Sequence, residues 1–486
     1  MTQQESVPHT VEKIGGTSMS RAHQLRDSIF IGDRENGAIY GRIFVVSAFG
    51  GITDMLLEHK KSGTPGVYAL FNNADNDQGW SDALNKVADA MCERHAEILD
   101  DNGDRDAADQ FVRERIAGAR SCLIDLQRLC SYGHFRLDQH MMTIRELLSG
   151  LGEAHSAYAT VLMLQRAGVN ARFVDLSGWR DEETFSLDER IRRAFEGVDL
   201  SSELPIVTGY AQCEEGLMRA FDRGYSEVTF SRIGVLTGAS EAIIHKEFHL
   251  SSADPKVVGL DAVQKIGRTN YDVADQLSNM GMEAIHPKAA KHLRQAGIPL
   301  RVTNAFEPRD PGTLIDDEPA EESRVEIVTG LGVYALELFE QDMVGVKGYD
   351  TAVLDVLTRH NVRIVSKTSN ANTITHYLDA PLKSVRRVER DLERLYPSAA
   401  ISARNLAVVS VIGCSLAGLG VMSTGLAALE AAGIDPVSLQ KTTRDVDVQF
   451  IVPRDRMDDA IRALHGALVP ATAEGAHPAR PKLAAA

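Results

Sequence analysis

The sequence predicts an α/β protein of two or three domains, and three observations carry this prediction. The chain has 486 residues, more than one hydrophobic core usually organises. Apolar runs rich in β-branched residues alternate with helix-like stretches through about Thr313, which is typical of a parallel or mixed sheet. After an acidic, proline-containing connection, IDDEPAEESR, two shorter segments repeat the order strand, turn, helix, strand.

The first two expected strands each end in a glycine-containing turn. VEKIGGTSMS places Lys13, Gly15 and Gly16 beside an apolar run, and RIFVVSAFGGITDML places Ser47 and Thr53 after the next one. A turn without side chains lets backbone N–H groups approach phosphate oxygens, and lysine adds positive charge. Ligands bind beyond the carboxyl ends of strands in open α/β sheets, so we expect the two loops to share one cleft. A plain Gly-Gly turn and ordinary helix N-caps are the alternative interpretation.

A helical lobe is expected between these loops and the next strands. From Ser81 to Leu99, apolar residues recur at steps of three and four, which predicts an amphipathic helix. A second helix is expected over Ala107 to Cys130, after the loop DDNGDRD. We interpret this lobe, about residues 80–135, as scaffold.

Composition narrows the classes of partner. With 68 acidic and 52 basic residues, the formal charge of -16 repels phosphate backbones and anionic membranes, so neither nucleic acid nor a membrane is expected as a partner. The five cysteines are scattered without a CxxC pair, which favours reduced thiols over a disulfide framework. No run approaches the roughly 18 apolar residues of a membrane span, and the N-terminus lacks the apolar core of a signal peptide. We therefore expect a cytoplasmic protein.

Several motifs occur in the order found in aspartate kinases: KIGGTS, VVSAFGGITDML, LLSGLGE, PIVTGY, GMEAIHPKAAKHLRQAGIPLRVTNAFEPRDPGTLI and the paired C-terminal repeats. The chain resembles this family over nearly its whole length. The resemblance implies an α/β/α sandwich of the amino acid kinase fold over residues 1–318. It further implies two ACT (βαββαβ) domains over 319–400 and 401–470, followed by a disordered tail over 471–486.

The activity implied by the resemblance is transfer of the γ-phosphate of ATP to the β-carboxylate of L-aspartate, with Mg²⁺ as cofactor. Phosphoryl transfer depends on positioning and charge neutralisation, so no protein nucleophile is required. The implied catalytic residues are Lys13, Glu153, Arg223 and Glu227. The implied aspartate-binding residues are Ser47, Ala48, Thr53, Glu153, Tyr210, Arg223 and Ser226. The implied nucleotide-binding residues are Lys13, Gly15, Gly16, Thr17, Ser18, Lys246, Glu247 and Asp254, and no side chain is assigned as a metal ligand.

The chemistry of two of these residues suits a small dicarboxylate. Arg223 is able to grip the α-carboxylate through a bidentate fork, and Glu153 is able to pair with Lys13 or with the substrate ammonium. Without the resemblance, the favoured explanations would be a solvated lysine before a turn for Lys13 and a carboxylate favoured by a helix N-terminus for Glu153.

The chain also departs from the family pattern. DRGYSE replaces the common GRGGSD, so Tyr225 stands in the place of a glycine and Glu227 in that of an aspartate. HKEFHLSSADP replaces the usual nucleotide segment, and Glu283 replaces a lysine for which Lys265 or Arg268 would compensate. The family usually has Phe where this chain has Tyr210. This combination resembles the aspartate kinases associated with ectoine synthesis.

Regulation is implied by the ACT-like repeats. Their candidate effector contacts, which are equally explained as ordinary turns, are Met343, Lys347, Tyr349, Asp350, Thr368 and Ser369. Because ACT domains pair through their sheets, we expect a homodimer or larger assembly that responds to an amino-acid effector. Two other functions stay open: a related glutamate or acetylglutamate kinase, and an amino-acid sensor without catalytic activity.

Overall fold

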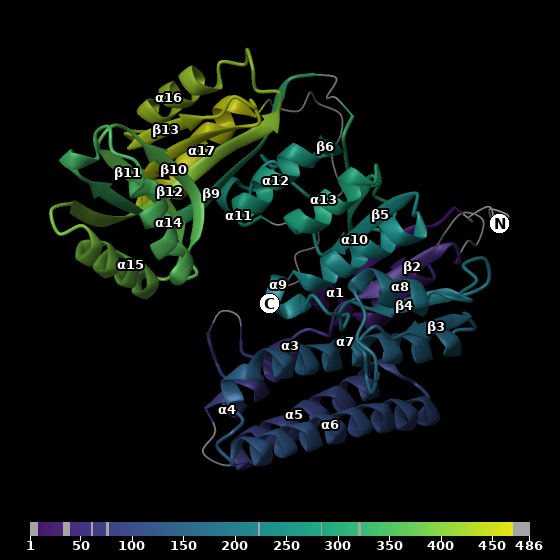
Figure 1. Ribbon diagram of the computed structural model, residues 1–486. Helices are drawn as coiled ribbons and strands as arrows, with labels where there is room; N and C mark the ends of the chain where they lie inside the picture. The colour runs from purple at the N-terminus through teal and green to yellow at the C-terminus, as the bar shows by residue number, and fades with distance from the viewer. Residues whose placement is uncertain are drawn as a thin grey trace, which may run out of the picture. The chain divides into compact units, whose positions relative to one another are not determined.

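The computed structural model describes residues 8–32, 39–59, 62–73, 77–221, 224–282, 284–318 and 322–469. They form two compact units, shown in Figure 1. The first unit comprises Met1–His249 and Ile285–Asp317, and the second comprises Leu250–Ala284 and Glu318–Ala486. The predicted tail, 471–486, lies outside the described residues.

The first unit is built on a mostly parallel sheet with the strand order β3-β4-β2-β1-β5-β7-β8. Its strands are β1 (Thr10–Ile14), β2 (Arg42–Val46), β3 (Ala171–Val174), β4 (Leu204–Thr208), β5 (Glu241–Lys246), β7 (Leu300–Asn304) and β8 (Thr313–Asp316). Only β8 runs antiparallel to its neighbour within this order. The apolar runs TVEKI, RIFVV and LPIVT are buried almost throughout, as expected for strands covered on both faces.

Helices cover this sheet. They are α1 (Gly16–Met19), α2 (Ala22–Leu25), α3 (Ile52–Leu56), α4 (Val67–Asn72), α5 (Gln78–Ile98), α6 (Asn102–Cys130), α7 (Met141–Arg166), α8 (Leu187–Ala194), α9 (Leu217–Phe221), α10 (Tyr225–Thr237) and α13 (Pro287–Gln295), with a π-helical turn at Arg26–Phe30 and a 3-10 turn at Leu137–Gln139. Helix α7 packs on β3 and β4, and α10 packs on β1. Helices α5 and α6 form the predicted helical lobe next to α7 (Figure 1). Among the described residues, no helix is long and apolar enough to cross a membrane.

A buried ionic network joins the three central strands. Glu12 on β1 is fully buried and accepts hydrogen bonds from Arg42 Nε on β2 at 2.7 Å and Arg42 Nη2 at 2.9 Å. His245 Nε2 on β5 lies 2.8 Å from the same carboxylate. Burial alone would raise the pKa of Glu12, but the charges and hydrogen bonds of Arg42 and His245 hold it well below its usual range. The network ties together the strands whose carboxyl ends carry the site described below.

The second unit contains a six-stranded antiparallel sheet with the order β10-β11-β9-β12-β14-β13. Its strands are β9 (Arg324–Phe339), β10 (Arg363–Ser369), β11 (Thr373–Asp379), β12 (Ala400–Cys414), β13 (Ser438–Lys441) and β14 (Asp447–Pro453), and β6 (Arg268–Asn270) belongs to the same unit. Its helices are α11 (Pro255–Val258), α12 (Tyr271–Asn279), α14 (Tyr349–Arg359), α15 (Leu382–Leu395), α16 (Val421–Ala431) and α17 (Met457–Leu468), with 3-10 turns at Gln341–Met343 and Arg454–Arg456.

The two C-terminal repeats share their longest strands. The order β9-α14-β10-β11-α15-β12 is the expected βαββαβ unit. The second repeat, β12-α16-β13-β14-α17, ends on a helix, and the first half of β9 supplies the remaining strand, because Val325 and Val328 lie in the core formed with α16 and α17. The predicted division at 400/401 falls at the start of β12, which pairs with β9 from Ala400 to Cys414. That division therefore does not separate two independent sheets.

The segment Leu250–Ala284 was expected in the kinase domain and instead belongs to the second unit. The reason is its apolar side chains: Val273, Leu277 and Met280 pack in one core with residues of β9 and β12 such as Ile327 and Val408. The other boundary, predicted at 318, lies next to the change of unit after Asp317.

We expect Arg42→Met to destabilise the protein by about 3–5 kcal/mol at pH 7, because it leaves the Glu12 carboxylate buried without its main partner. The pKa of Glu12 is depressed in the folded state, so this contribution is present above the unfolded pKa and is lost as the pH falls. Urea unfolding at several pH values measures it. The matched control is Arg26→Met, which removes a solvent-exposed pair with Asp27 and should cost under about 1 kcal/mol. Equal losses in the two variants would contradict the assignment.

Candidate active site

The loops after β1 and β2 lie against each other, as predicted. A Cβ atom added to Gly16 would stand 2.5 Å from the carbonyl oxygen of Ala48, so only glycine fits there without displacing backbone. The backbone N–H of Ser47 donates to the carbonyl of Ile14 at 3.1 Å. The strands β1 and β2 pair in parallel, which brings both carboxyl ends to the same edge of the sheet. The two loops therefore lie together at one edge of the sheet, and the expectation that they share a cleft stays a prediction.

Lys13 forms the charged centre of this edge. Its side chain is only 11% exposed, and Nζ donates to Glu227 Oε1 at 3.2 Å. The other oxygen of Glu227 accepts from the backbone N–H of His286. Burial would raise the pKa of Glu227, but the charges of Lys13 and Lys246 and the His286 N–H hold it below its usual value. Glu227 is thus an ionised carboxylate in the first turn of α10, and its pairing with Lys13 joins β1 to that helix.

Glu153 is a second buried carboxyl near the same lysine. It lies in the middle of α7 and is 2% exposed. Burial raises its pKa to about 8, although the charge of Lys13, the Tyr210 backbone N–H and the Tyr225 hydroxyl act in the opposite direction. Its Oε2 atom has no hydrogen-bond partner among the described residues. A buried carboxyl oxygen without a donor is a place for a donor that arrives with the substrate.

Glycine at position 209 leaves space beside that oxygen. A Cβ atom added to Gly209 would lie 3.1 Å from Glu153 Oε2 and 2.8 Å from the Cβ of Ser226, the predicted substrate residue at the start of α10. Gly209 directly follows β4, so this space lies at the carboxyl end of a third strand. Sequence reasoning did not single out Gly209, although it is part of the quoted motif PIVTGY.

Two of the departures from the family pattern, Tyr210 and Tyr225, have structural partners. Tyr210, where Phe is usual, is 2% exposed, and its hydroxyl donates to Glu146 Oε2 at 2.6 Å. Burial and the nearby Glu146 charge raise the pKa of Tyr210, so it stays neutral. Tyr225, in place of a glycine, packs edge-on against Tyr210 with ring centroids 5.8 Å apart and donates to Glu153. Sequence reasoning missed Glu146; its signal is that a buried tyrosine hydroxyl needs an acceptor.

The remaining aspartate-pocket predictions are distributed as follows. Ala48 is buried, and the carbonyl of Ser47 accepts from Ser156 Oγ at 2.9 Å. Thr53 is half-buried on α3, two residues after Gly51. The φ of Gly51, 86°, lies in the left-handed region. Arg223 lies outside the described residues, so its predicted role stays a prediction.

Among the predicted nucleotide-binding residues, Ser18 Oγ donates to Glu247 Oε1 at 2.6 Å, and this bond joins α1 to the end of β5. Gly15 precedes α1 in an extended conformation and Thr17 is exposed. Lys246 ends β5, and its charge acts on Glu227. Asp254 belongs to the second unit, where its carboxylate accepts from the Lys256 N–H at 2.8 Å and caps α11.

The residues named in connection with the missing lysine are also distributed. Glu283 lies outside the described residues, and Lys265 and Arg268 belong to the second unit. Arg268 pairs there with Glu318 at 2.5 Å. Compensation by either cation therefore stays a prediction.

The regulatory candidates fall into two groups. Met343 is buried in the core under α14 and α15, Tyr349 stacks on Tyr396 with centroids 4.7 Å apart, and Asp350 pairs with Lys367 at 2.6 Å. Lys347 is exposed.

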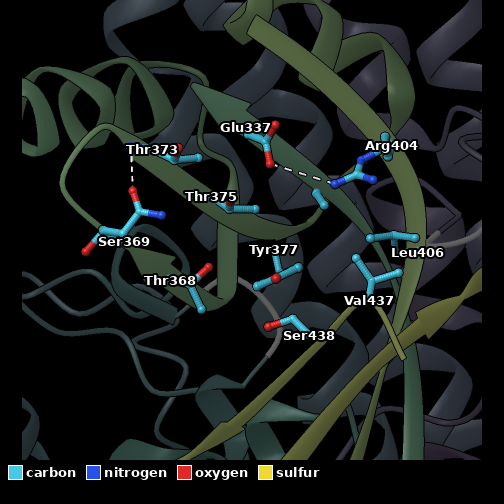
Figure 2. Close-up of a pocket in the computed structure, with 12 residues that line it drawn as sticks. Glu337, Thr368, Ser369, Thr373, Thr375, Tyr377, Arg404, Leu406, Val437 and Ser438 are labelled. Atoms are coloured by element: carbon cyan, nitrogen blue, oxygen red, sulfur yellow. Dashed lines mark hydrogen bonds and ion pairs between the residues drawn. The ribbon is translucent and has the colours of Figure 1, made fainter. Parts of the chain in front are cut away.

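Thr368 and Ser369 instead line a cavity of about 250 Å³ in the second unit. Figure 2 shows them with Glu337 and Arg404, whose charged groups face each other 3.7 Å apart from the adjacent strands β9 and β12. The described residues therefore do not place the six candidates around one cavity.

Comparisons with known proteins show the family to which the chain belongs. The model of the amino acid kinase family matches residues 9–304. Aspartate kinase Ask_Ect of Stutzerimonas stutzeri (strain A1501) is 52% identical over 463 residues, covering 95% of this chain and 97% of that protein. The crystal structure of E. coli aspartokinase III in complex with lysine and aspartate has a TM-score of 0.68 at 19% identity, covering 95% of this chain and 99% of that one.

A second solved protein has a similar fold. Aspartate kinase of Clostridium acetobutylicum has a TM-score of 0.67 at 16% identity, covering 95% of this chain and 99% of that chain. The predicted α/β fold class and the resemblance drawn from the motifs are confirmed. The chain belongs to the aspartate kinases of the amino acid kinase family.

Proposed function

We propose that this protein transfers the γ-phosphate of ATP to the β-carboxylate of L-aspartate and forms 4-phospho-L-aspartate. The observation that carries the proposal is the position of Lys13 at the carboxyl end of β1, where its charge acts on two buried carboxyl groups, Glu227 and Glu153. The 52% identity to an aspartate kinase over nearly the whole chain supports the choice of substrate.

Lys13 serves the reaction through charge. ATP and aspartate are both anions, and the chain itself carries a net charge of -16, so a local cation is needed to bring them together. Glu227 holds the lysine ammonium in place from α10. The aspartate β-carboxylate is itself the nucleophile, so the protein positions it in line and supplies no covalent group.

Glu153 serves the reaction by receiving the ammonium of aspartate. Its Oε2 atom is buried and lacks a partner among the described residues. An ammonium beside it favours the ionised carboxylate, so binding of aspartate should release the proton that burial retains. We assign the α-carboxylate to Arg223, whose planar fork suits bidentate contact.

ATP and Mg²⁺ complete the proposal. The oxygen donors next to the phosphate loop, Ser18 and Glu247, are of the type that Mg²⁺ accepts. When bound with ATP, the ion would neutralise charge on the phosphates. Gly15, Gly16 and Thr17 would direct backbone N–H groups at the same phosphates, because the first N–H groups of a helix have no partner within the helix.

We further propose that the product supplies ectoine synthesis, that an amino acid regulates the enzyme through the second unit, and that the chain forms at least a dimer. The altered nucleotide segment and the named relative support the first point. Strands β10 and β13 form the edges of the regulatory sheet, which supports pairing between copies. Light scattering of the full chain at micromolar concentration tests the last point, and a monomer would contradict it.

The activity is tested by trapping the acyl phosphate as a hydroxamate, with aspartate and glutamate compared in the presence of ATP. We expect product from aspartate, and we expect Lys13→Met to reduce its formation by about 10²–10³-fold, because one charge-stabilising group is lost. The control is Lys86→Met, which removes an exposed lysine of α5. Product from glutamate alone would support a different amino acid kinase, and no product from either acid would support a sensor without catalytic activity.

Glu153→Gln should lower aspartate turnover and, relative to wild type, raise the free energy of unfolding as the pH rises. The wild-type carboxyl has a pKa raised from 4.5 to about 8, so the folded state holds its proton more tightly and stability is lost as the pH rises through this interval. The loss is up to about 1.4 kcal/mol per pH unit. The free energy of unfolding of Glu153→Gln relative to wild type should therefore rise between pH 5 and pH 8, while aspartate turnover falls. A pH-independent difference between the two proteins would rule this out.

A further inference from the structure

A cluster of three side chains with metal-binding chemistry lies in the helical lobe, outside the active site. Cys92 and His95 are one turn apart on α5, and Asp109 projects from α6. One donor atom from each residue lies within 4.8 Å of the other two, and His95 Nδ1 lies 2.7 Å from Asp109 Oδ1. His95 is buried, whereas Cys92 and Asp109 are partly exposed. The cluster therefore has a buried inner side and an open outer side.

A fourth side chain borders the inner side of the cluster. His155 of α7 is 1% exposed and packs edge-on against His95 with ring centroids 4.8 Å apart. Among the described residues, neither ring nitrogen of His155 makes a hydrogen bond of normal geometry. The backbone of Met91 acts on this ring, but a buried imidazole nitrogen without a hydrogen bond of normal geometry is unfavourable. This observation is independent of the spacing of the first three residues.

We propose that Cys92, His95 and Asp109 bind one Zn²⁺-type ion, with water in the fourth position. Thiolate, imidazole and carboxylate together suit a borderline-soft transition metal rather than Mg²⁺ or Ca²⁺. Metal–ligand bonds of about 2.0–2.3 Å place neighbouring donors of a tetrahedral site about 3.3–3.6 Å apart. The donor atoms lie within 4.8 Å of one another, so reaching these spacings requires shifts of at most about 1.5 Å, which rotation of the partly exposed side chains supplies.

Proton balance and access are both satisfied. The Cys92 thiol releases its proton to solvent as the metal bond forms. A proton on the coordinating His95 nitrogen leaves to solvent, and the other ring nitrogen then carries the imidazole proton. A surface hollow of about 560 Å³ opens beside Asp109 and is lined by Asp106, Asp109, Gln110, Arg113, Glu114 and Ala117. Its carboxylates favour entry of a cation. Arg113 also approaches Cys92, but its side chain is exposed and is able to turn away.

The bound ion would join α5 to α6. The two helices already pack along each other, and Trp80 at the beginning of α5 contacts Phe71 of α4. An ion bound by Cys92, His95 and Asp109 would cross-link the middle of α5 to α6. The ion would act on this helix pair, and its binding does not depend on the proposed reaction, which takes place at the carboxyl ends of β1 and β2.

The test uses the chelator-treated full chain titrated with Co²⁺. We expect one Co²⁺ per chain, with a thiolate-to-cobalt band in the near ultraviolet and the intense visible bands of a tetrahedral site. Cys92→Ser should lose the near-ultraviolet band, and Asp109→Asn should bind at least about tenfold more weakly. The matched control is Cys122→Ser, an exposed cysteine of α6, which should behave as wild type.

A second measurement separates ligand loss from misfolding. Far-ultraviolet circular dichroism of the metal-free variants should match wild type, and added Zn²⁺ should raise the melting temperature of wild type and Cys122→Ser but not of Cys92→Ser. The proposal is overturned if wild type shows no thiolate-to-cobalt band, or if Cys92→Ser retains it.

Discussion

The ammonium group of Lys13 is shared by two buried carboxyl groups, and the site depends on this arrangement. Glu227 forms an ion pair with Lys13 and is ionised. The charge of Lys13 also acts on Glu153, but burial outweighs it and raises the pKa of Glu153 to about 8. Two carboxyls next to one lysine thus differ in protonation because their hydrogen-bond partners differ. Glu227 holds the cation in place, and Glu153 has an oxygen without a hydrogen-bond partner among the described residues.

The frame around Lys13 accounts for its position. Strand β1 lies between β2 and β5, and the buried Glu12 binds Arg42 and His245 across those neighbours. Lys13 follows Glu12 in the chain, so its side chain points to the opposite face of the sheet. At the end of β1, the close approach of Gly16 to Ala48 joins the two loops. A buried ionic network and one glycine contact therefore position the edge of the sheet at which the proposed site lies.

The parts that could be predicted from the sequence were those with local signals. Apolar runs followed by glycine turns predicted β1, β2 and their loops, and a period of three to four residues predicted α5. A helical stretch after the loop DDNGDRD predicted α6. The motif resemblance brought Lys13, Glu153 and Glu227 into one hypothesis. Contacts between distant residues could not be predicted, such as Glu146 with Tyr210 or Arg42 with Glu12. The strand sharing of β9 and β12 was also missed, because sequence periodicity shows a strand but not which repeat it completes.

The most direct test of this account is the titration of Glu153 itself, followed by infrared spectroscopy through the C=O stretch of its protonated carboxyl. Subtracting the spectrum of Glu153→Gln isolates the signal of this residue. The account predicts that the protonated form disappears near pH 8 in the wild type, and that Lys13→Met moves this transition to higher pH because the favourable charge is removed. An identical transition with and without Lys13, or one near pH 4.5, would contradict it.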